Sequence, residues 1–209
     1  SNDDSSLDST DDVMNRTTSP DDIINRTALL PVIPASDIDI TFIGTASCVP
    51  GLTRGVSCTA LRRSGEVWLF DAGEGTQISI QRSTVRPGRI TKIFLTHAHG
   101  DHTFGLMGIL CLMGQDWDRT GEPVEIFGLQ GTRAYLRASA RYTISRVLPP
   151  HRVHELHDVP HLHRFSSNPS PIPDITIEMD SKYGEVAGGR DIFPNEEGVW
   201  ECVTEEEGG

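Results

Sequence analysis

The run HAHGDH at residues 97–102 constrains the fold more than any other feature, because it places four potential metal ligands within six positions. Directly before it, residues 90–95 are β-branched and apolar, which is typical of a buried strand. Directly after it, the apolar residues 103–113 predict a helix. We therefore expect the ligands on a loop that joins a strand to a helix.

The order of ligands in the HAHGDH run predicts one half of a two-metal hydrolase site. Alternate side chains of an extended segment share a face, so His97 and His99 are expected to hold one ion. Asp101 and His102, where the chain turns away, are expected to reach a second ion. Imidazole and carboxylate are typical ligands of hydrolytic zinc or manganese, not of an all-cysteine structural site. The alternative is a chance cluster of surface histidines.

The rest of the chain predicts a mixed β-sheet with helices. Strands are expected from residue 38 and at 57–62, 66–70, around 124 and around 152, and helices at 75–83 and 132–141. Residues 161–173 hold three prolines and predict a loop, whereas 175–179 and 199–203 predict short antiparallel strands.

Composition separates an acidic tail from the remaining chain. Residues 1–37 are rich in Asp, Ser, Thr and Asn and contain a repeat, DDVMNRT and then DDIINRT, so we expect a disordered tail. Their acidity argues against a transit peptide. No apolar run approaches the roughly 18 residues of a membrane span. Four widely spaced cysteines fit a reducing compartment, most simply the cytoplasm, with the nucleus or an organelle as alternatives.

The net charge is −12, but the charges are unevenly distributed along the chain. Residues 1–40 carry two basic and nine acidic side chains, and residues 158–209 carry three and twelve. Residues 41–157 carry thirteen and nine, so the segment that holds the HAHGDH run is basic. A phosphate-binding face would need this asymmetry, although each single arginine is better explained as a solvated surface residue.

Four blocks of sequence resemble the ribonuclease Z family of the metallo-β-lactamase superfamily. They are ITFIGTA at 40–46 with Pro50 and Arg54, FDAGEGTQ at 70–77, ITKIFLTHAHGDHTFGLMG at 90–108, and the later strands at 124–128 and 153–156. The metal motif alone would indicate only the superfamily. Joined to GEGTQ and the GLMG helix, it indicates ribonuclease Z.

The resemblance implies an α/β fold, the metallo-β-lactamase αββα sandwich, of which this chain covers the first ββα half plus further strands. It extends from about Ile38 to about Val203, and it ends before the family's third metal histidine, bridging aspartate and final histidine. No histidine follows His163, and the chain opens on Ser1. We therefore expect an N-terminal part of a larger enzyme, with residues 38–209 as an incomplete domain.

The resemblance also implies a zinc-dependent endoribonuclease that removes the 3′ trailer from precursor tRNA by two-metal phosphodiester hydrolysis. Its cofactors would be two zinc ions, with manganese as an alternative. Its substrate partner would be precursor tRNA. The complete short-form protein would also form a homodimer, and no membrane association is expected. The alternatives are another hydrolase of the superfamily, acting on thioesters, cyclic nucleotides or sulfate esters, and a non-catalytic fragment that acts by binding. The 209 residues alone are expected to be inactive.

Several residues receive roles beside the metal ligands. Asp101, as the carboxylate nearest the attacking water, is expected to orient or deprotonate it as the catalytic residue. Asp71 either fixes the tautomer of a ligand histidine or caps the following helix. Glu74, Thr76 and Arg54 are assigned to the glycine-rich turn and the substrate-contacting loop on the strength of the resemblance.

A second group of histidines lies outside the resemblance to the metal motif. These histidines fall within thirteen residues and could hold a further metal ion: His151, His154, His157, His161 and His163. Their spacing spans a predicted strand and a proline-rich loop, which favours ordinary structural positions.

Overall fold

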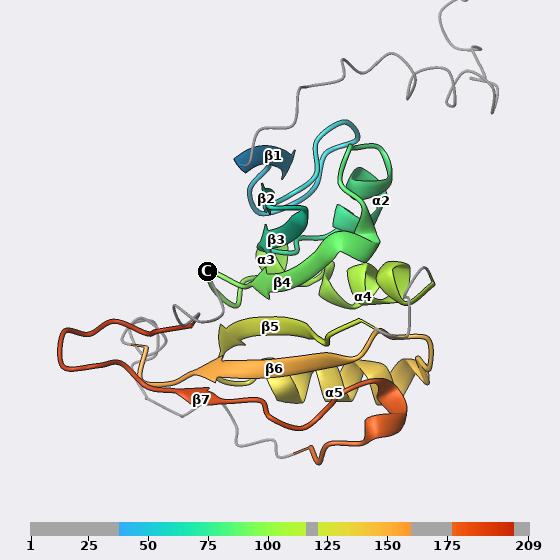
Figure 1. Ribbon diagram of the computed structural model, residues 1–209. Helices are drawn as coiled ribbons and strands as arrows, with labels where there is room; N and C mark the ends of the chain where they lie inside the picture. Colours follow the sequence, from blue (N-terminus) through green and yellow to red (C-terminus); the bar gives the residue numbers. More distant parts are fainter. Residues whose placement is uncertain (1–37, 116–120, 160–176, 203–209) are drawn as a thin grey trace, which may run out of the picture. The chain divides into compact units, whose positions relative to one another are not determined.

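The computed structural model describes residues 38–115, 121–159 and 177–202 (Figure 1). The predicted tail and repeat at 1–37 and the predicted loop at 161–173 lie outside these residues. Within them, no helix is both long enough and apolar enough to cross a membrane.

One seven-stranded sheet organises the described residues, and its strands lie in chain order. They are β1 (Ile38–Gly44), β2 (Cys58–Arg63), β3 (Glu66–Phe70), β4 (Ile90–Phe94), β5 (Val124–Leu129), β6 (His151–Leu156) and β7 (Asp191–Ile192). The first three strands form an antiparallel meander, and every pairing from β3 to β7 is parallel. Parallel neighbours need crossover connections, and helices supply most of them.

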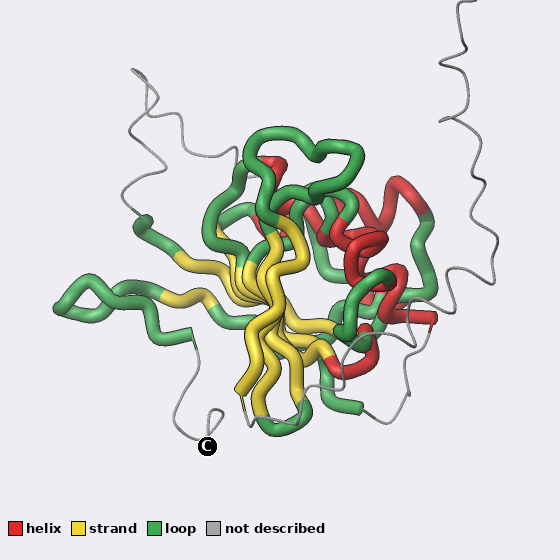
Figure 2. Tube along the Cα trace, turned by 90° about the horizontal axis from the view of Figure 1, so that it is seen from above, coloured by secondary structure: helices red, strands yellow, loops and turns green. Residues whose placement is uncertain are grey.

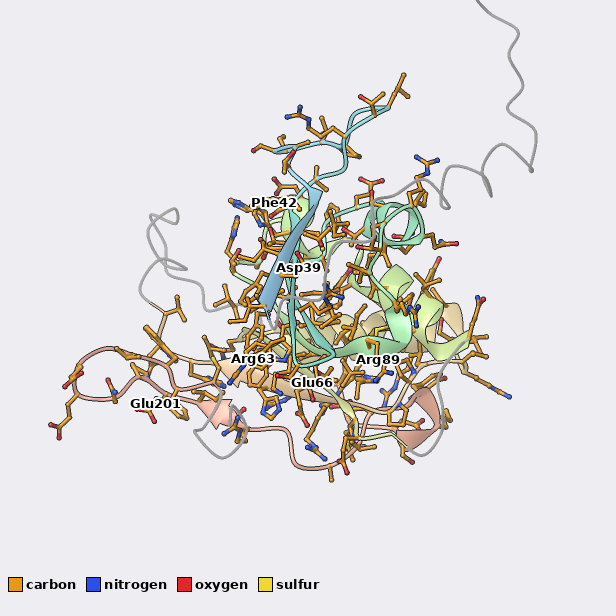
Figure 3. All side chains as sticks on the ribbon, turned by 45° about the horizontal axis from the view of Figure 1, so that its top comes forward. Asp39, Phe42, Arg63, Glu66, Arg89 and Glu201 are labelled. Carbon is orange, nitrogen blue, oxygen red and sulfur yellow. The ribbon has the colours of Figure 1, made fainter. Side chains whose placement is uncertain are left out.

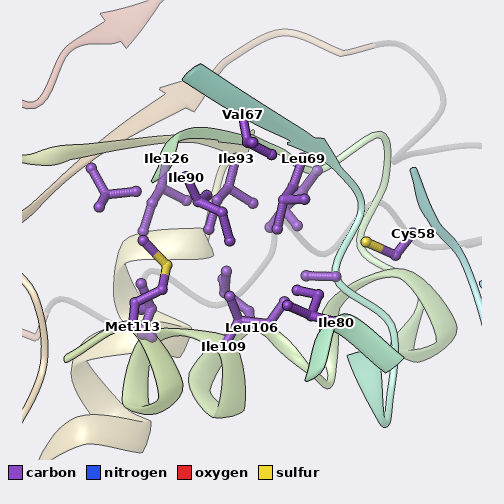
Figure 4. Packing of buried hydrophobic residues seen from close by; sticks show 14 of the residues in the cluster. Cys58, Val67, Leu69, Ile80, Ile90, Ile93, Leu106, Ile109, Met113 and Ile126 are labelled. Carbon is purple, nitrogen blue, oxygen red and sulfur yellow. The ribbon is translucent and has the colours of Figure 1, made fainter. Parts of the chain in front are cut away.

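The helices cover one face of this sheet (Figure 2). They are α2 (Thr76–Gln81), α3 (Gly100–Thr103), α4 (Leu106–Gln115) and α5 (Thr132–Thr143), with short 3-10 turns η1 (Pro87–Arg89) and η3 (Ser181–Tyr183). Every second side chain of the strands faces these helices, because successive side chains of a strand lie on opposite faces of the sheet. Leu69, Ile93 and Ile126 thus meet Leu106 and Ile109 of α4 in a fully buried core (Figure 4).

The opposite face of the sheet carries an aromatic row. The rings of Phe70 and Phe94 stack with centroids 5.1 Å apart, Phe94 and Phe127 follow at 4.9 Å, and Phe127 and His154 at 4.5 Å. On the edge strand β1, Phe42 is 71% exposed. In the described residues no helix covers this face, which agrees with one ββα half of the sandwich that the resemblance implies.

Two expectations about secondary structure were wrong. The helix predicted at 103–113 is two helices, because the amide of Gly105 donates to the Ala72 carbonyl and the chain breaks there. Residues 177–179 and 199–202 form no strand. Asn195 instead accepts hydrogen bonds from the amides of Glu197 and Val199 in a local turn, and the short strand β7 pairs with β6 in parallel.

Candidate metal centre

The HAHGDH run lies where the carboxyl ends of β3 and β4 meet the start of α3. Backbone hydrogen bonds hold the run against the glycine-rich turn that follows β3. The amide of Asp71 donates to the carbonyl of Phe94, and the amide of Ala72 donates to the carbonyl of His102, each at 2.7 Å. Gly73 permits this close approach, because a Cβ there would lie 2.2 Å from the carbonyl oxygen of Asp101. The two segments therefore form one packed unit.

The four ligand side chains gather in two adjacent pairs. Nε2 of His97 lies 3.1 Å from Nδ1 of His99, and Nε2 of His102 lies 3.6 Å from Oδ2 of Asp101. The two pairs are adjacent because the ring of His97 lies against the ring of His102, with centroids 3.9 Å apart. A tetrahedral zinc ion with ligands at about 2.1 Å places neighbouring ligand atoms roughly 3.4 Å apart. Both pairs therefore have the spacing of two ligands on one ion.

Each pair offers an ion two protein ligands. Across the described residues, no three side chains that include a member of the HAHGDH run bring their ligand atoms within 4.8 Å of one another. A catalytic zinc ion normally binds three protein ligands and a water molecule. The donor chemistry and the spacing fit zinc, and each ion would need one further ligand.

Asp71 supports the pair formed by Asp101 and His102 from behind. It is 5% exposed, and its Oδ1 accepts hydrogen bonds from the amide and the hydroxyl of Thr96 at 2.9 and 2.8 Å. Its Oδ2 accepts from the Ser57 hydroxyl at 2.8 Å and from Nδ1 of His102 at 2.6 Å. Because a carboxylate only accepts, the proton of a neutral His102 ring is on Nδ1 and the lone pair on Nε2 faces Asp101.

The capping alternative for Asp71 is wrong. Helix α2 has Gly75 as its N-cap, with a φ of 78° and no side-chain hydrogen bond. Asp71 itself has a φ of 66°, a left-handed conformation that few residues other than glycine adopt. Four hydrogen bonds from three separate segments hold it there.

Asp101 is oriented by a residue that sequence reasoning missed. The backbone amide of Cys48, in the loop between β1 and β2, donates to Oδ2 of Asp101 at 2.7 Å. This hydrogen bond holds the pKa of Asp101 below its ordinary value. Burial, reinforced by His102 and His99, lowers the pKa of His97. At neutral pH the site therefore presents a carboxylate and a neutral imidazole, the forms in which these groups bind metals.

Comparisons with known proteins point to one family. The profile of the metallo-β-lactamase superfamily matches residues 51–110. Over these residues the chain is similar to that superfamily. It is 38% identical over 175 residues to the mouse protein named zinc phosphodiesterase ELAC protein 1, covering 81% of this chain and 46% of the relative. It is 50% identical over 119 residues to a ribonuclease Z from Picosynechococcus, covering 56% of this chain and 37% of the relative.

A solved structure supports the same family. The crystal structure of human tRNase Z, short form, has a TM-score of 0.63 to this chain at 37% identity. The match covers 80% of this chain and 56% of the human one. The chain thus spans about half the length of these metallo-β-lactamase superfamily relatives.

The other residues assigned from the family resemblance form no hydrogen bond or ion pair with the ligand pairs in the described part of the chain. Thr76 is buried, and its hydroxyl donates to the carbonyl of Gly73 at 2.7 Å, so it shapes the glycine-rich turn. Glu74 and Arg54 are exposed. The roles of all three residues stay predictions.

Two members of the second histidine group have structural partners. Nδ1 of the buried His151 donates to the carbonyl of Pro149 at 3.0 Å, and burial lowers the pKa of His151. Nε2 of the buried His154 lies 2.6 Å from Oε2 of Glu125. His161 and His163 lie outside the described residues.

The third member, His157, lies in a cluster with Glu155 and Asp191 whose ligand atoms are within 4.8 Å of one another. Arg133 already joins the two carboxylates of this cluster, at 3.3 Å from Glu155 and 2.5 Å from Asp191. Glu155 also accepts from the amides of Gly131 and Arg133 at the start of α5. The cluster is thereby explained as an ion-pair network that fixes α5 and β7 to β6.

Proposed function

We propose that this protein is a ribonuclease Z-type endoribonuclease that removes the 3′ trailer from precursor tRNA, with two zinc ions, or manganese ions, at the HAHGDH run. One observation carries the proposal. The run supplies two pairs of side chains, and the atoms within each pair are separated as two ligands of one ion would be. Asp71 holds His102 from behind. The identity of 37% to human tRNase Z, short form, supports the substrate.

The residues of the site have distinct roles in this proposal. Zinc, when bound, would supply an acidified water molecule and neutralise charge on the phosphate oxygens. His97 and His99 would hold one ion, and His102 presents Nε2 because Asp71 holds its other nitrogen. Asp101 would hold the second ion and, as the catalytic residue, would orient a water molecule and accept its proton. The Cys48 amide keeps this carboxylate in position.

The remaining parts of the proposal concern partners and the rest of the protein. The excess of basic side chains in residues 41–157 supports a phosphate-rich partner such as RNA. Resemblance to the short-form enzymes supports a homodimer. The cysteines of the described residues are free, which fits the cytoplasm. Residues outside the described part of the chain would supply the third ligand of each ion.

Substitution of Asp101 tests the function in the full-length enzyme. We expect Asp101→Ala to lower the single-turnover rate of pre-tRNA cleavage by at least about 100-fold, because it removes a metal ligand and the proton acceptor. Binding of pre-tRNA should change by less than about twofold, since most of that affinity comes from phosphate contacts. Glu66→Gln, at an exposed carboxylate on the far end of β3, is the matched control. An Asp101→Ala enzyme that keeps a tenth of the wild-type rate would refute the assignment.

The 209-residue chain itself provides a second test. With two ligands per ion, it should lose zinc during dialysis and should not cleave pre-tRNA. Elemental analysis that finds two zinc ions per chain after dialysis would show that these residues complete the site.

A further inference from the structure

A cavity lined by arginines lies at the opposite end of the strands from the metal centre. Asp39 and Arg89 of its lining are labelled in Figure 3. The cavity has a volume of about 330 Å³, and it lies between the meander β1–β3 and the segment that ends in η1. The residues that matter for its chemistry are Arg62, Arg86 and Arg89, with Asp39, Thr41 and Thr84. We call it the arginine pocket. It has the size of a site for a small molecule, for which about 300 to 1,000 Å³ is usual.

Arg62 occupies an unusual position at the back of this pocket. It follows Cys58 and Ala60 on the side of β2 that faces the core, and both of those residues are buried. Its side chain continues this face of β2 at the rim of the sheet, where it is 42% exposed. Nη2 donates to Oδ2 of Asp39 at 3.0 Å, while Nε is enclosed and has no acceptor. A guanidinium has five N–H donors, so this group retains unused hydrogen-bonding capacity.

The other two arginines add positive charge to the lining. Arg86 and Arg89 are exposed, and no carboxylate of the described residues lies within ion-pair distance of either. Among the described residues of the lining, Asp39 is the one acidic side chain, against three arginines. A concave site with an excess of positive charge concentrates anions. The hydroxyls of Thr41 and Thr84 add further donors to the same lining.

We propose that the arginine pocket binds a phosphate group. Guanidinium groups bind phosphate oxygens through paired, charge-assisted hydrogen bonds, and the lining offers three of them with hydroxyl donors beside them. The phosphate comes from a small polyphosphate or from an RNA backbone, since both present the same oxygens. This site is independent of the metal centre and does not depend on the proposed nuclease activity.

The test is a titration of metal-free protein with inorganic pyrophosphate at constant ionic strength, followed by the NMR signals of the arginine Nε–H groups. The Arg62 signal should shift and saturate. Arg89→Gln should weaken binding about tenfold or more, because it removes a charged donor. Arg146→Gln, at an exposed arginine after α5, should leave the affinity within about twofold. These two positions are exposed, so both variants should fold.

A 2′-O-methylated RNA hexanucleotide, titrated in parallel, distinguishes the two sources of phosphate. Binding of the hexanucleotide with the same loss in Arg89→Gln assigns the pocket to RNA backbone. Binding of pyrophosphate alone, again lost in Arg89→Gln, assigns it to a small polyphosphate. Absence of saturable binding for both probes, or equal losses in Arg89→Gln and Arg146→Gln, would overturn the proposal.

Discussion

Replacing Asp71 with asparagine should move the proton of the His102 ring from one nitrogen to the other. In the native chain Oδ1 of Asp71 accepts from the Thr96 amide at 2.9 Å, and Oδ2 lies 2.6 Å from Nδ1 of His102. An asparagine must turn its oxygen to the Thr96 amide, which can only donate. Its NH₂ group then faces His102, whose Nδ1 has to accept. The ring proton therefore moves to Nε2, the nitrogen beside Asp101.

The size of this effect follows from the strength of the contact. A hydrogen bond to a charged group contributes about 1.5 to 3 kcal/mol, so the native carboxylate favours the Nδ1–H tautomer by about 13- to 160-fold. A neutral amide at the same place contributes about 0.5 to 1.5 kcal/mol, so the variant should favour Nε2–H by about 2- to 13-fold. Long-range ¹H–¹⁵N correlation spectra of metal-free protein at pH 8 report which ring nitrogen carries the proton.

A matched control separates the tautomer from a general loss of hydrogen bonds. Ser57→Ala removes another donor from the same oxygen of Asp71, but it leaves the carboxylate facing His102. It should retain the Nδ1–H tautomer. In the full-length protein, Asp71→Asn should also weaken zinc binding about 10- to 100-fold. A variant that keeps the proton on Nδ1 would show that Asp71 does not set the tautomer.

Three further predictions concern stability and reactivity. Gly105→Ala should lower the free energy of unfolding in urea by about 1 to 3 kcal/mol, because its Cβ would lie 2.0 Å from a backbone oxygen. Gly51→Ala, whose Cβ would meet nothing closer than 3.8 Å, should change it by less than about 0.5 kcal/mol, and equal values would contradict the reasoning. Burial raises the pKa of Cys58 to about 12, so about one thiol in ten thousand is ionised at pH 8. A disulfide reagent should therefore label the exposed Cys48 in the native protein and Cys58 only after unfolding; rapid native labelling of Cys58 would refute this. Burial lowers the pKa of His151 below 6.5, so the unfolded chain takes up the proton first and stability falls as the pH drops below about 6.5. Denaturant titrations between pH 7 and 5 should show a smaller fall for His151→Gln, and an unchanged fall would exclude His151 as its cause.

Much of the sheet could be predicted because its strands have local signals. The buried strand β4 is a short run of β-branched and apolar residues, and the turn at Ser64 and Gly65 separates β2 from β3. The break before α4 had no such signal, since residues 103–113 are apolar throughout. It depends on a contact between Gly105 and Ala72, which are distant in the chain. Tertiary packing therefore overrides the local pattern there.

The candidate site, like the sheet, could be predicted from the sequence only in part. The candidate ligand pairs could be proposed because one short segment supplies all four side chains. The contribution of Cys48 could not, because it comes from a backbone amide 53 positions from Asp101 and any residue type except proline could provide it. The arginine pocket was equally hidden, since Arg62 and Arg89 become neighbours only through the pairing of β2, β3 and β4.

The left-handed backbone at Asp71 narrows the residues that this position can accept. Glycine would adopt the φ of 66° without strain, but it has no carboxylate to receive the four donors. Glutamate would carry the charge on a longer side chain, and it lacks the tolerance of left-handed backbone that aspartate and asparagine share. Asparagine fits the backbone and brings a donor where His102 needs an acceptor. Among the twenty amino acids, aspartate alone fits the backbone of the turn and also supplies the acceptor that the His102 ring needs.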